Sequence, residues 1–460
     1  MNTSDSKGIG ENGPLQTQGS GPAVPQENSP IMPHPDNPKY FLFRGRPTVL
    51  VTSASHYGAI INPDYDFIRE LDELKRHGLN LVRLLGGHYR EIKEDFGISR
   101  DILYTERYLA PFLCDGSGRY DPTRPNPAYH ERLRAFAAAC SERGIVIEYS
   151  LFCPFYHETL WEICPLNPAN HGALVAPTDR MRFHTLHDPA MTALLEGYAA
   201  HILETLQPFD NVYFEIMNEP YVTETPLDFE RHFAAFIRRW ESTRPNRHMV
   251  SRNVANGWER LEHDPLFDLY SFHYASPPTA VTVNRGIPTA IGFNETGFAG
   301  NDVNAYRRQA WDFLMAGGSL FNNLDYSFAV GYEDGTWQHP SDPGAGSIRL
   351  RAQLGMLRRF LEQADLVRLQ PDLAPLVRCH TLHGTGACLR GENECLFHFR
   401  TENELKVLFD LKSGTWRFSW LDCITGDAWE ETVQSEGRVR KDFAWKNAVR
   451  ELALHAAFMG

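Results

Sequence analysis

The 460-residue sequence lacks a long apolar segment, an excess of basic residues and closely spaced cysteine pairs. No apolar run approaches the roughly 20 residues that a transmembrane helix needs, so no membrane partner is expected. Lys and Arg number 45 against 58 Asp and Glu, a net charge of −13, and so acidic a chain is poorly suited to bind nucleic acid. The hydrophobic fraction of 42% is ordinary for a globular protein and excludes wholesale disorder.

The eight cysteines are scattered and form no Cys-x-x-Cys motif. Disulfide frameworks are typical of short secreted chains and structural zinc needs paired ligands, so buried free thiols are expected. The first 30 residues have neither the basic start nor the apolar core of an export signal. We therefore expect a cytoplasmic protein, although a leader that had been removed would leave no trace here.

Residues 1–33 are rich in Gly, Ser, Pro, Gln and Asn and lack hydrophobic periodicity, which predicts a flexible tail. From 34 to 370, strand-like and helix-like segments alternate, as in parallel βα units. Helical spacing covers 66–78, 128–143, 191–206, 228–240, 302–316 and 348–363. Eight strands are expected, beginning at Thr48, Leu79, Ile145, Asn211, His248, Leu269, Thr289 and Ser319. Eight such repeats predict an α/β fold, a (β/α)8 TIM barrel.

The competing architecture is a doubly wound open sheet, which usually carries a glycine-rich phosphate-binding turn after its first strand. The corresponding turn here, Thr52–Gly58, has no such character, so the barrel is favoured. After residue 370 the pattern changes to short alternating stretches separated by turn signals. Residues 371–460 therefore predict a small C-terminal antiparallel β-sandwich domain.

Two glutamates stand where active residues of a barrel lie, at the carboxyl ends of its strands. The fourth strand ends in Asn218-Glu219-Pro220 and the seventh in Asn294-Glu295. Strands four and seven face each other across the barrel mouth, so the two carboxyls should meet. Burial and mutual repulsion should raise at least one pKa, which gives one acid and one anion, the pair that glycoside cleavage needs.

The set of Arg83 on strand two, Asn218 and Glu219 on strand four and Glu295 on strand seven resembles the retaining glycoside hydrolases of clan A, and family 5, the cellulase-like group, most of all. The resemblance spans residues 38–365. It implies that Glu219 is the general acid/base and Glu295 the nucleophile. It also implies that Asn218 binds the sugar 2-hydroxyl and that Arg83 keeps Glu295 ionised.

Other parts of the family pattern match less closely. His273 and Tyr274 correspond to a family His and Tyr that are normally separated by one residue. Adjacent residues on a strand point to opposite faces, so both fit only if the strand ends between them. Where the family offers a tryptophan on strand eight, this chain has Asn322, Asn323 and Asp325, which predicts sugar recognition by hydrogen bonds.

His157 and Trp258, in loops after strands three and five, are further candidate substrate contacts, although packing explains such residues equally well. His56, His88 and His157 together raise a rival hypothesis, a metal-dependent barrel hydrolase or isomerase. No His-x-His closes the first strand, which argues against a metal. A carbohydrate-binding pseudoenzyme is the other alternative.

The function that the sequence predicts is a retaining β-glycosidase that acts on a carbohydrate by double displacement and needs no cofactor or metal. Short oligosaccharides or glycosides are the expected substrates, and an exo-acting pocket is favoured over an open cleft.

Overall fold

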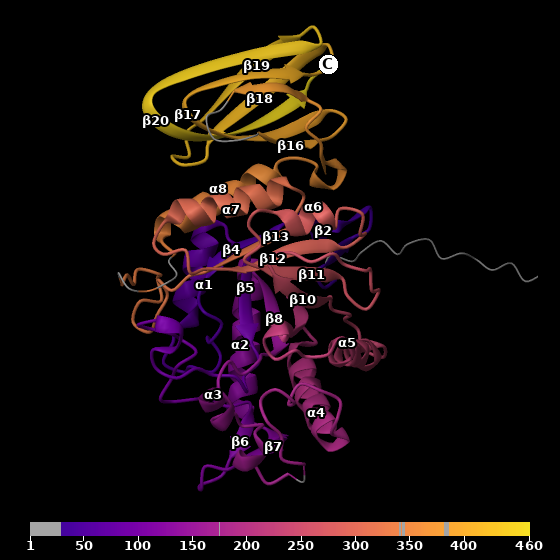
Figure 1. Ribbon diagram of the computed structural model, residues 1–460, viewed down its shortest axis with the longest axis vertical. Coiled ribbons are helices and arrows are strands. Elements are labelled where there is room, and N and C mark those ends of the chain that lie inside the picture. The colour runs from indigo at the N-terminus through magenta and orange to yellow at the C-terminus, as the bar shows by residue number, and fades with distance from the viewer. Residues whose placement is uncertain (1–28, 174, 340–341, 343–345, 381–385) are drawn as a thin grey trace, which may run out of the picture.

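The computed structural model describes residues 29–173, 175–339, 342, 346–380 and 386–460. Eight parallel strands form one sheet in the order β4-β13-β12-β11-β10-β9-β8-β5, which rolls into a barrel (Figure 1). They are β4 (Leu50–Ala54), β5 (Leu81–Leu85), β8 (Val146–Phe152), β9 (Val212–Met217), β10 (Val250–Asn256), β11 (Leu269–His273), β12 (Ala290–Thr296) and β13 (Leu320–Leu324). The predicted TIM barrel is confirmed, and the strands begin within two residues of their expected starts.

The helices that follow these strands form the outer layer. The long ones are α1 (Phe67–His77), α2 (Pro127–Arg143), α4 (Pro189–Leu206), α5 (Leu227–Glu241), α7 (Val303–Met315) and α8 (Ile348–Glu362), and the short ones are α3 (Glu158–Glu162) and α6 (Thr279–Val283). The residues at the two ends of α1 show why a helix begins and ends where it does. In α1 the Asp66 side chain caps the Ile68 N–H, and Gly78 ends the helix in the left-handed conformation.

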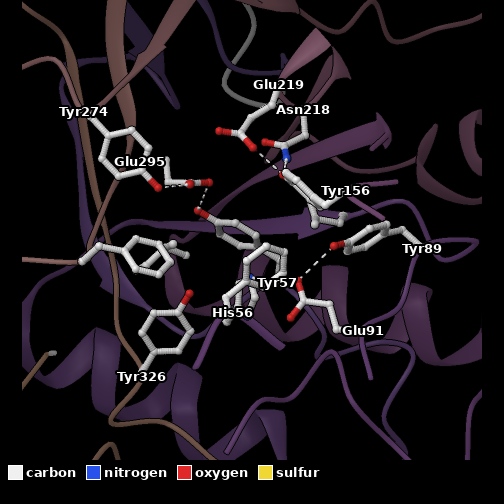
Figure 2. A pocket seen from close by; sticks show the side chains of 14 residues that line it. His56, Tyr57, Tyr89, Glu91, Tyr156, Asn218, Glu219, Tyr274, Glu295 and Tyr326 are labelled. Carbon is white, nitrogen blue, oxygen red and sulfur yellow. Dashed lines mark hydrogen bonds and ion pairs between the residues drawn. The ribbon is translucent and has the colours of Figure 1, made fainter. Parts of the chain in front are cut away.

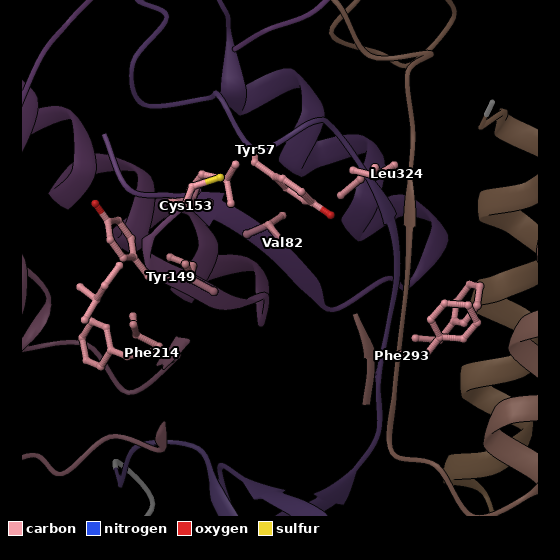
Figure 3. Close-up of a cluster of buried hydrophobic side chains, with 14 of the residues drawn as sticks. Tyr57, Val82, Tyr149, Cys153, Phe214, Phe293 and Leu324 are labelled. Carbon is pink, nitrogen blue, oxygen red and sulfur yellow. The ribbon is translucent and has the colours of Figure 1, made fainter. Parts of the chain in front are cut away.

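The barrel closes between β4 and β5 through Asn80, whose backbone N–H donates to the Val51 carbonyl at 3.2 Å. Asn80 Oδ1 accepts from the Val51 N–H at 2.8 Å, and Asn80 Nδ2 donates to the Val49 carbonyl at 2.9 Å. The buried side chains in Figure 3, among them Tyr149 and Phe214, belong to the large apolar core of the barrel. This packed surrounding holds the strand ends, and hence the site, in fixed positions.

An N-terminal meander that the sequence did not predict covers the end of the barrel at which its strands begin. It consists of β1 (Met32–His34), β2 (Asn37–Phe43) and β3 (Arg46–Thr48). Ile31 and Phe41 are fully buried against the first residues of the barrel strands, such as Leu50 and Leu81. The tail was expected to reach residue 33, but the chain is already packed at Ile31; residues 1–28 lie outside the described residues. A hairpin, β6 (Phe112–Cys114) and β7 (Tyr120–Pro125), also departs from the simple βα repeat.

The C-terminal domain is an antiparallel β-sandwich, as predicted, with strands β14 (Gln370–Pro371), β15 (Leu376–His380), β16 (Ala387–Arg390), β17 (Glu394–Asp410), β18 (Gly414–Asp422), β19 (Ala428–Ser435) and β20 (Arg438–Phe458). Two stretches expected as separate strands, 395–400 and 405–411, are one strand, β17. A register shift between Glu402 and Glu404, with Asn403 at φ +65°, bends this strand along its partner β20.

The sandwich packs on α7 and α8, as Figure 1 shows. Trp311 of α7 stacks on His398 with ring centroids 4.5 Å apart, and Gln353 of α8 donates to the Ile424 carbonyl at 3.0 Å. Between them, Arg307 forms a fully buried pair with both oxygens of Glu451, at 2.9 and 2.8 Å. Apolar residues of the sandwich, Leu396 among them, belong to the same core cluster as the barrel.

Two expectations about the chain as a whole can be compared with the structure. All eight cysteines are free thiols, as predicted, and six of them are buried, whereas Cys114 is exposed and Cys379 half-buried. Among the described residues, no helix is both long and apolar enough to cross a membrane.

Candidate active site

A cavity of about 100 Å³ opens at the carboxyl ends of the barrel strands (Figure 2). Its wall contains three glutamates, five tyrosines and two phenylalanines. Of the lining residues, only Phe96 (42%) and Phe298 (44%) are more than one third exposed, so they mark the mouth. Both have left-handed backbones, with φ +55° and +57°, a conformation that is costly for an aromatic residue and that concentrates at functional sites.

The two predicted glutamates meet in this cavity. Glu219 follows β9 and Glu295 lies in β12, and they are 8% and 7% exposed. An oxygen of each carboxylate and a ring nitrogen of His273 lie within 4.8 Å of one another. Strands four and seven thus bring together two acids that are 76 positions apart in the sequence.

Glu219 is held by three donors. Its backbone is left-handed, at φ +40°, where the chain turns from β9 into the single turn that begins at Pro220. One carboxylate oxygen, Oε1, accepts from the Tyr221 hydroxyl at 3.0 Å and lies 3.1 Å from His273 Nδ1. The other, Oε2, accepts a short hydrogen bond from the Tyr156 hydroxyl.

Glu295 is also surrounded by donors. Oε1 accepts from the Tyr274 hydroxyl at 2.9 Å, and Oε2 from Arg83 Nη1 at 3.2 Å and the Tyr57 hydroxyl at 3.3 Å. Hydrogen bonds of this kind fix the orientation of a carboxylate.

Arg83 lies beneath both acids and is fully buried. Its guanidinium donates to Glu148 at 2.8 Å, to Asn218 Oδ1 at 2.9 Å, to Glu295, and through a short contact to Glu215. Glu215, four residues before Glu219 in β9, is thus a buried partner of Arg83. Burial raises the pKa of Glu215 to about 8, although the positive charge of Arg83 opposes this rise. Asn218 is therefore oriented from below, and its Nδ2 donates to the Tyr156 hydroxyl at 3.0 Å on the cavity side.

His273 and Tyr274 both reach the site although they are adjacent in sequence. β11 ends at His273, and Tyr274 has a left-handed backbone, at φ +49°. This turn removes the strand alternation that would have sent one side chain away from the cavity. The condition that the sequence imposed, that the strand end between them, is met.

The protonation of the pair differs from expectation. Burial alone would raise the pKa of Glu219, but the hydrogen bond from His273 and its charge, with the Tyr156 and Tyr221 hydroxyls, lower it to about 2. Burial opposes a charge on His273, yet the negative Glu295 and the hydrogen bond to Glu219 raise its pKa above the ordinary 6.5. These directions favour an ionised Glu219 beside a protonated His273, whereas the sequence predicted a proton on one of the carboxyl groups.

Two predicted substrate contacts lie in loops outside the cavity wall. His157 precedes α3 and places its Nε2 3.2 Å from Asp95 Oδ1. Trp258 is 54% exposed in the loop after β10. Neither belongs to the lining residues, so a contact with the sugar in this cavity is not supported for either.

The strand-eight residues are also placed differently from the expectation. Asp325 is fully buried, accepts from Ser53 Oγ at 2.7 Å and pairs with Arg351 Nη1 at 2.8 Å. Asn323 is fully buried and donates to Ser53 at 3.0 Å. Neither residue is among those that line the cavity, so a contact of these side chains with a sugar in it is not supported and stays a prediction.

Most of the tyrosines around the two acids were missed by the sequence reasoning. Tyr57 and Tyr156 follow strands one and three, and Tyr221 lies two residues after Glu219. Position after a strand end was the one available signal, and aromatic residues are too common there to be singled out. The lining residues Glu91 and Phe96 come from a long loop after β5 that carries no motif.

The histidines of the rival metal hypothesis do not come together. His88 is buried among aromatic rings, where burial lowers its pKa to about 3, and His157 contacts Asp95. His56 lies in the cavity wall beside Glu91 and Asp101, and one donor atom from each lies within 4.8 Å of the others. A second group with this spacing is Glu219, His273 and Glu295.

No family model matches the chain, and no curated protein matches it in sequence. Solved structures do share its fold. A glycoside hydrolase family 5 protein from Bacteroides vulgatus matches with a TM-score of 0.65 at 11% identity, covering 95% of each chain. A protein described as a glycoside hydrolase gives 0.64 at 10%, covering 95% of this chain and 98% of the other. An endo-1,4-beta-mannanase from Rhizomucor miehei gives 0.52 at 12%, covering 73% of this chain and all of the other. The chain thus has the barrel fold of family 5 glycoside hydrolases.

Proposed function

We propose that the protein is a retaining glycoside hydrolase that cleaves a β-glycosidic bond in an oligosaccharide or glycoside. One observation carries the proposal: two glutamates from opposite strands approach within 4.8 Å in a single cavity that a sugar can enter. The fold shared with family 5 structures supports it, and so does the Arg83–Asn218–Glu219–Glu295 set.

In the first step, Glu295 attacks the anomeric carbon and forms a glycosyl-enzyme. Arg83, Tyr57 and Tyr274 orient its carboxylate for this attack. The departing oxygen needs a proton, and Glu219 supplies it as general acid. Since the resting proton lies on His273, 3.1 Å from Glu219, His273 passes it to Glu219 as the leaving oxygen approaches.

In the second step, the ionised Glu219 accepts a proton from the water that attacks the glycosyl-enzyme. Its low pKa keeps the carboxylate ionised and therefore able to accept that proton. Asn218, held by Arg83, presents its amide to the sugar 2-hydroxyl. An oxygen of one acid lies within 4.8 Å of an oxygen of the other. So short a contact leaves little room for the water that an inverting enzyme holds between carboxyls about 6.5–9.5 Å apart, and it suits the separation of about 5–5.5 Å in retaining enzymes.

The test is covalent trapping. A panel of nitrophenyl glycosides, furanosides included, identifies the sugar, and the corresponding 2-fluoro glycoside with a good leaving group is then incubated with the protein. We expect one sugar to be bound per chain, and peptide mass spectrometry should locate it on Glu295. The Glu295→Gln variant should take up none, whereas Glu262→Gln, a matched change at an exposed position, should be labelled like the wild type. Hydrolysis of the panel with label on another residue would remove Glu295 from the mechanism, and a folded protein that hydrolyses no glycoside would contradict the proposal.

A further inference from the structure

One end of the cavity has polar groups that the two-glutamate reaction does not use. Tyr57, Tyr156 and Tyr274 donate to the catalytic carboxylates. His56 and Glu91 do not contact those carboxylates, yet both line the same cavity. Figure 2 shows them across the cavity from Glu219 and Glu295.

The geometry of His56 leaves one ring nitrogen for a ligand. Nδ1 lies 2.9 Å from Asp101 Oδ1 and donates to it, because a carboxylate oxygen accepts. In the neutral ring Nε2 is then an acceptor. It lies 3.7 Å from Glu91 Oε1, too far for a hydrogen bond, and has no hydrogen-bond partner among the described residues. His56 is 8% exposed, so bulk water does not replace that partner freely.

Glu91 also has an acceptor atom that is available to a ligand. It is 4% exposed, and Glu91 Oε2 and Asp101 Oδ2 both lack a hydrogen-bond donor within the described part of the chain. Burial, together with the charge of Asp101, raises the pKa of Glu91 well above its usual range. A proton on Glu91 can therefore be donated to Asp101. Oε1, which accepts from the Tyr89 hydroxyl at 3.1 Å, keeps a second lone pair for a ligand.

The cavity thus presents two acceptor atoms 3.7 Å apart, opposite the reacting carboxylates. Neighbouring hydroxyls of a sugar ring are two donors on adjacent carbons, so one can donate to His56 and the other to Glu91. The cavity has a volume of only about 100 Å³, which favours a single sugar ring over several.

We propose that His56 and Glu91 bind two adjacent hydroxyls of the terminal sugar and close the cavity behind it, so that the protein removes single sugars from chain ends. This inference rests on the proposed function and adds the direction of cleavage and the recognition of the glycon. Asp101 is a positioning residue, which fixes the tautomer of His56 and holds Glu91.

The first experiment pairs altered enzymes with altered substrates. The nitrophenyl glycoside that the wild type cleaves fastest is compared with analogues that each lack one ring hydroxyl. We expect two adjacent deletions to lower kcat/KM at least about tenfold in the wild type, because each leaves a buried acceptor unpaired. His56→Phe should abolish the penalty for one of these deletions and Glu91→Leu that for the other.

Controls separate recognition from folding. Glu91→Gln keeps a donor for Asp101 and an acceptor for the sugar, so it should restore most of the activity that Glu91→Leu loses. Glu106→Gln, an exposed change in the same loop, should match the wild type. A pattern of penalties that is the same in all variants overturns the assignment. So does a stoichiometric divalent metal in the purified protein that is lost in His56→Phe, because the cluster would then be a metal site.

The second experiment tests the closed end. A linear oligosaccharide labelled at its reducing end should lose one sugar at a time, so that the first products are the monosaccharide and the chain shortened by one. Early mid-length products would overturn exo action while leaving the glycosidase intact. If no glycoside is hydrolysed, calorimetric binding of the monosaccharide and its deoxy analogues still tests the His56–Glu91 site, which distinguishes its failure from that of the proposed function.

Discussion

Two fully buried arginines of this protein, Arg83 and Arg307, sit in opposite electrostatic situations. Arg307, between the barrel and the sandwich, binds both oxygens of Glu451, and its remaining donor meets Asn304 and Gln353 at 2.9 and 3.1 Å. Arg308 adds a second positive charge to the same carboxylate. Arg83, below the cavity, faces three carboxylates, Glu148, Glu215 and Glu295.

The difference indicates which cluster serves structure and which serves chemistry. The Arg307 cluster has no excess of negative charge: two guanidiniums meet one carboxylate, and Arg307 and Glu451 are fully buried, as a stabilising buried pair requires. The Arg83 cluster has more acids than bases, which is unfavourable in itself, and one of its acids, Glu295, lines a cavity. A buried cluster with an excess of negative charge, in which one carboxylate lines a cavity, is typical of a functional site.

The largest difference between the two clusters is expected in kcat, when Glu295, the carboxylate that lines the cavity, is replaced. Glu295→Gln should lower kcat by at least about 10³-fold, because the nucleophile is lost. The free energy of unfolding should stay within about 1 kcal/mol of the wild type or rise, since a repulsive charge is removed. Steady-state kinetics and urea unfolding of the same sample measure both quantities. A large loss of stability would mean that Glu295 belongs to a structural pair.

The Arg307 cluster should give the opposite result. Glu451→Gln leaves Arg307 buried without its counter-charge and should lower the free energy of unfolding by about 3–5 kcal/mol. The folded fraction should retain its kcat, since Glu451 belongs to the sandwich, at its interface with the barrel, and is not part of the cavity wall. Denaturant unfolding, with active-site titration by the fluorosugar, measures the two separately. Reduced kcat per labelled site would show that the interface controls the chemistry.

Exchanging the guanidinium for an ammonium tests whether the fork of Arg83 is needed. Arg83→Lys keeps the charge but cannot bind Glu148, Asn218 and Glu295 at once. We expect kcat to fall by about 10- to 100-fold, through misplacement of Asn218 and Glu295. The equivalent Arg307→Lys change should leave kcat unaltered and reduce only stability. Equal effects of both changes on kcat would abolish the distinction between the clusters.

The smallest expected effect is a change in pH dependence. His273 has a raised pKa, so its proton is present below 6.5 and is lost as the pH rises through the raised value. The alkaline limb of kcat/KM should therefore lie above pH 6.5, and the stabilisation by the His273 ion pairs should be lost over the same range. The lowered pKa of Glu219, about 2, predicts that its ion-pair stabilisation is complete above pH 4.5 and fades as the pH falls toward 2. An alkaline limb that is unchanged in His273→Gln would contradict the proton transfer proposed here.

The barrel could be predicted because its signal is local and repeated. Continuous apolar strands recur eight times, and a helix follows each of them except β10; Gly78 and Asp66 show how the ends of such a helix are encoded. The N-terminal meander escaped because its strands are short and Pro-containing, and Ile31 is buried only through contacts distant in the sequence. The continuity of β17 escaped because the residues of its bulge resemble a turn.

The site could be predicted where polar or charged residues mark the ends of strands. Glu219, Glu295, Arg83 and Asn218 were found in this way, whereas the burial of Asp325 escaped because nothing local shows that Arg351 covers it. The protonation of Glu219 also escaped, since it depends on His273 from another strand. Long-range pairing of charges is set by packing, and one sequence does not display it.

The contacts of the sandwich with α7 and α8 have a consequence for how the nucleophile is held. These helices flank strand β13 and follow β12, the strand that carries Glu295. A chain shortened at residue 370 would leave the Arg307 guanidinium without its acid and the indole of Trp311 without its stacked ring. Glu451→Gln weakens one of these contacts, whereas loss of the last 90 residues removes all of them. Only the larger change should let α7 shift and displace the Glu295 carboxylate, and it should do so before the barrel itself unfolds.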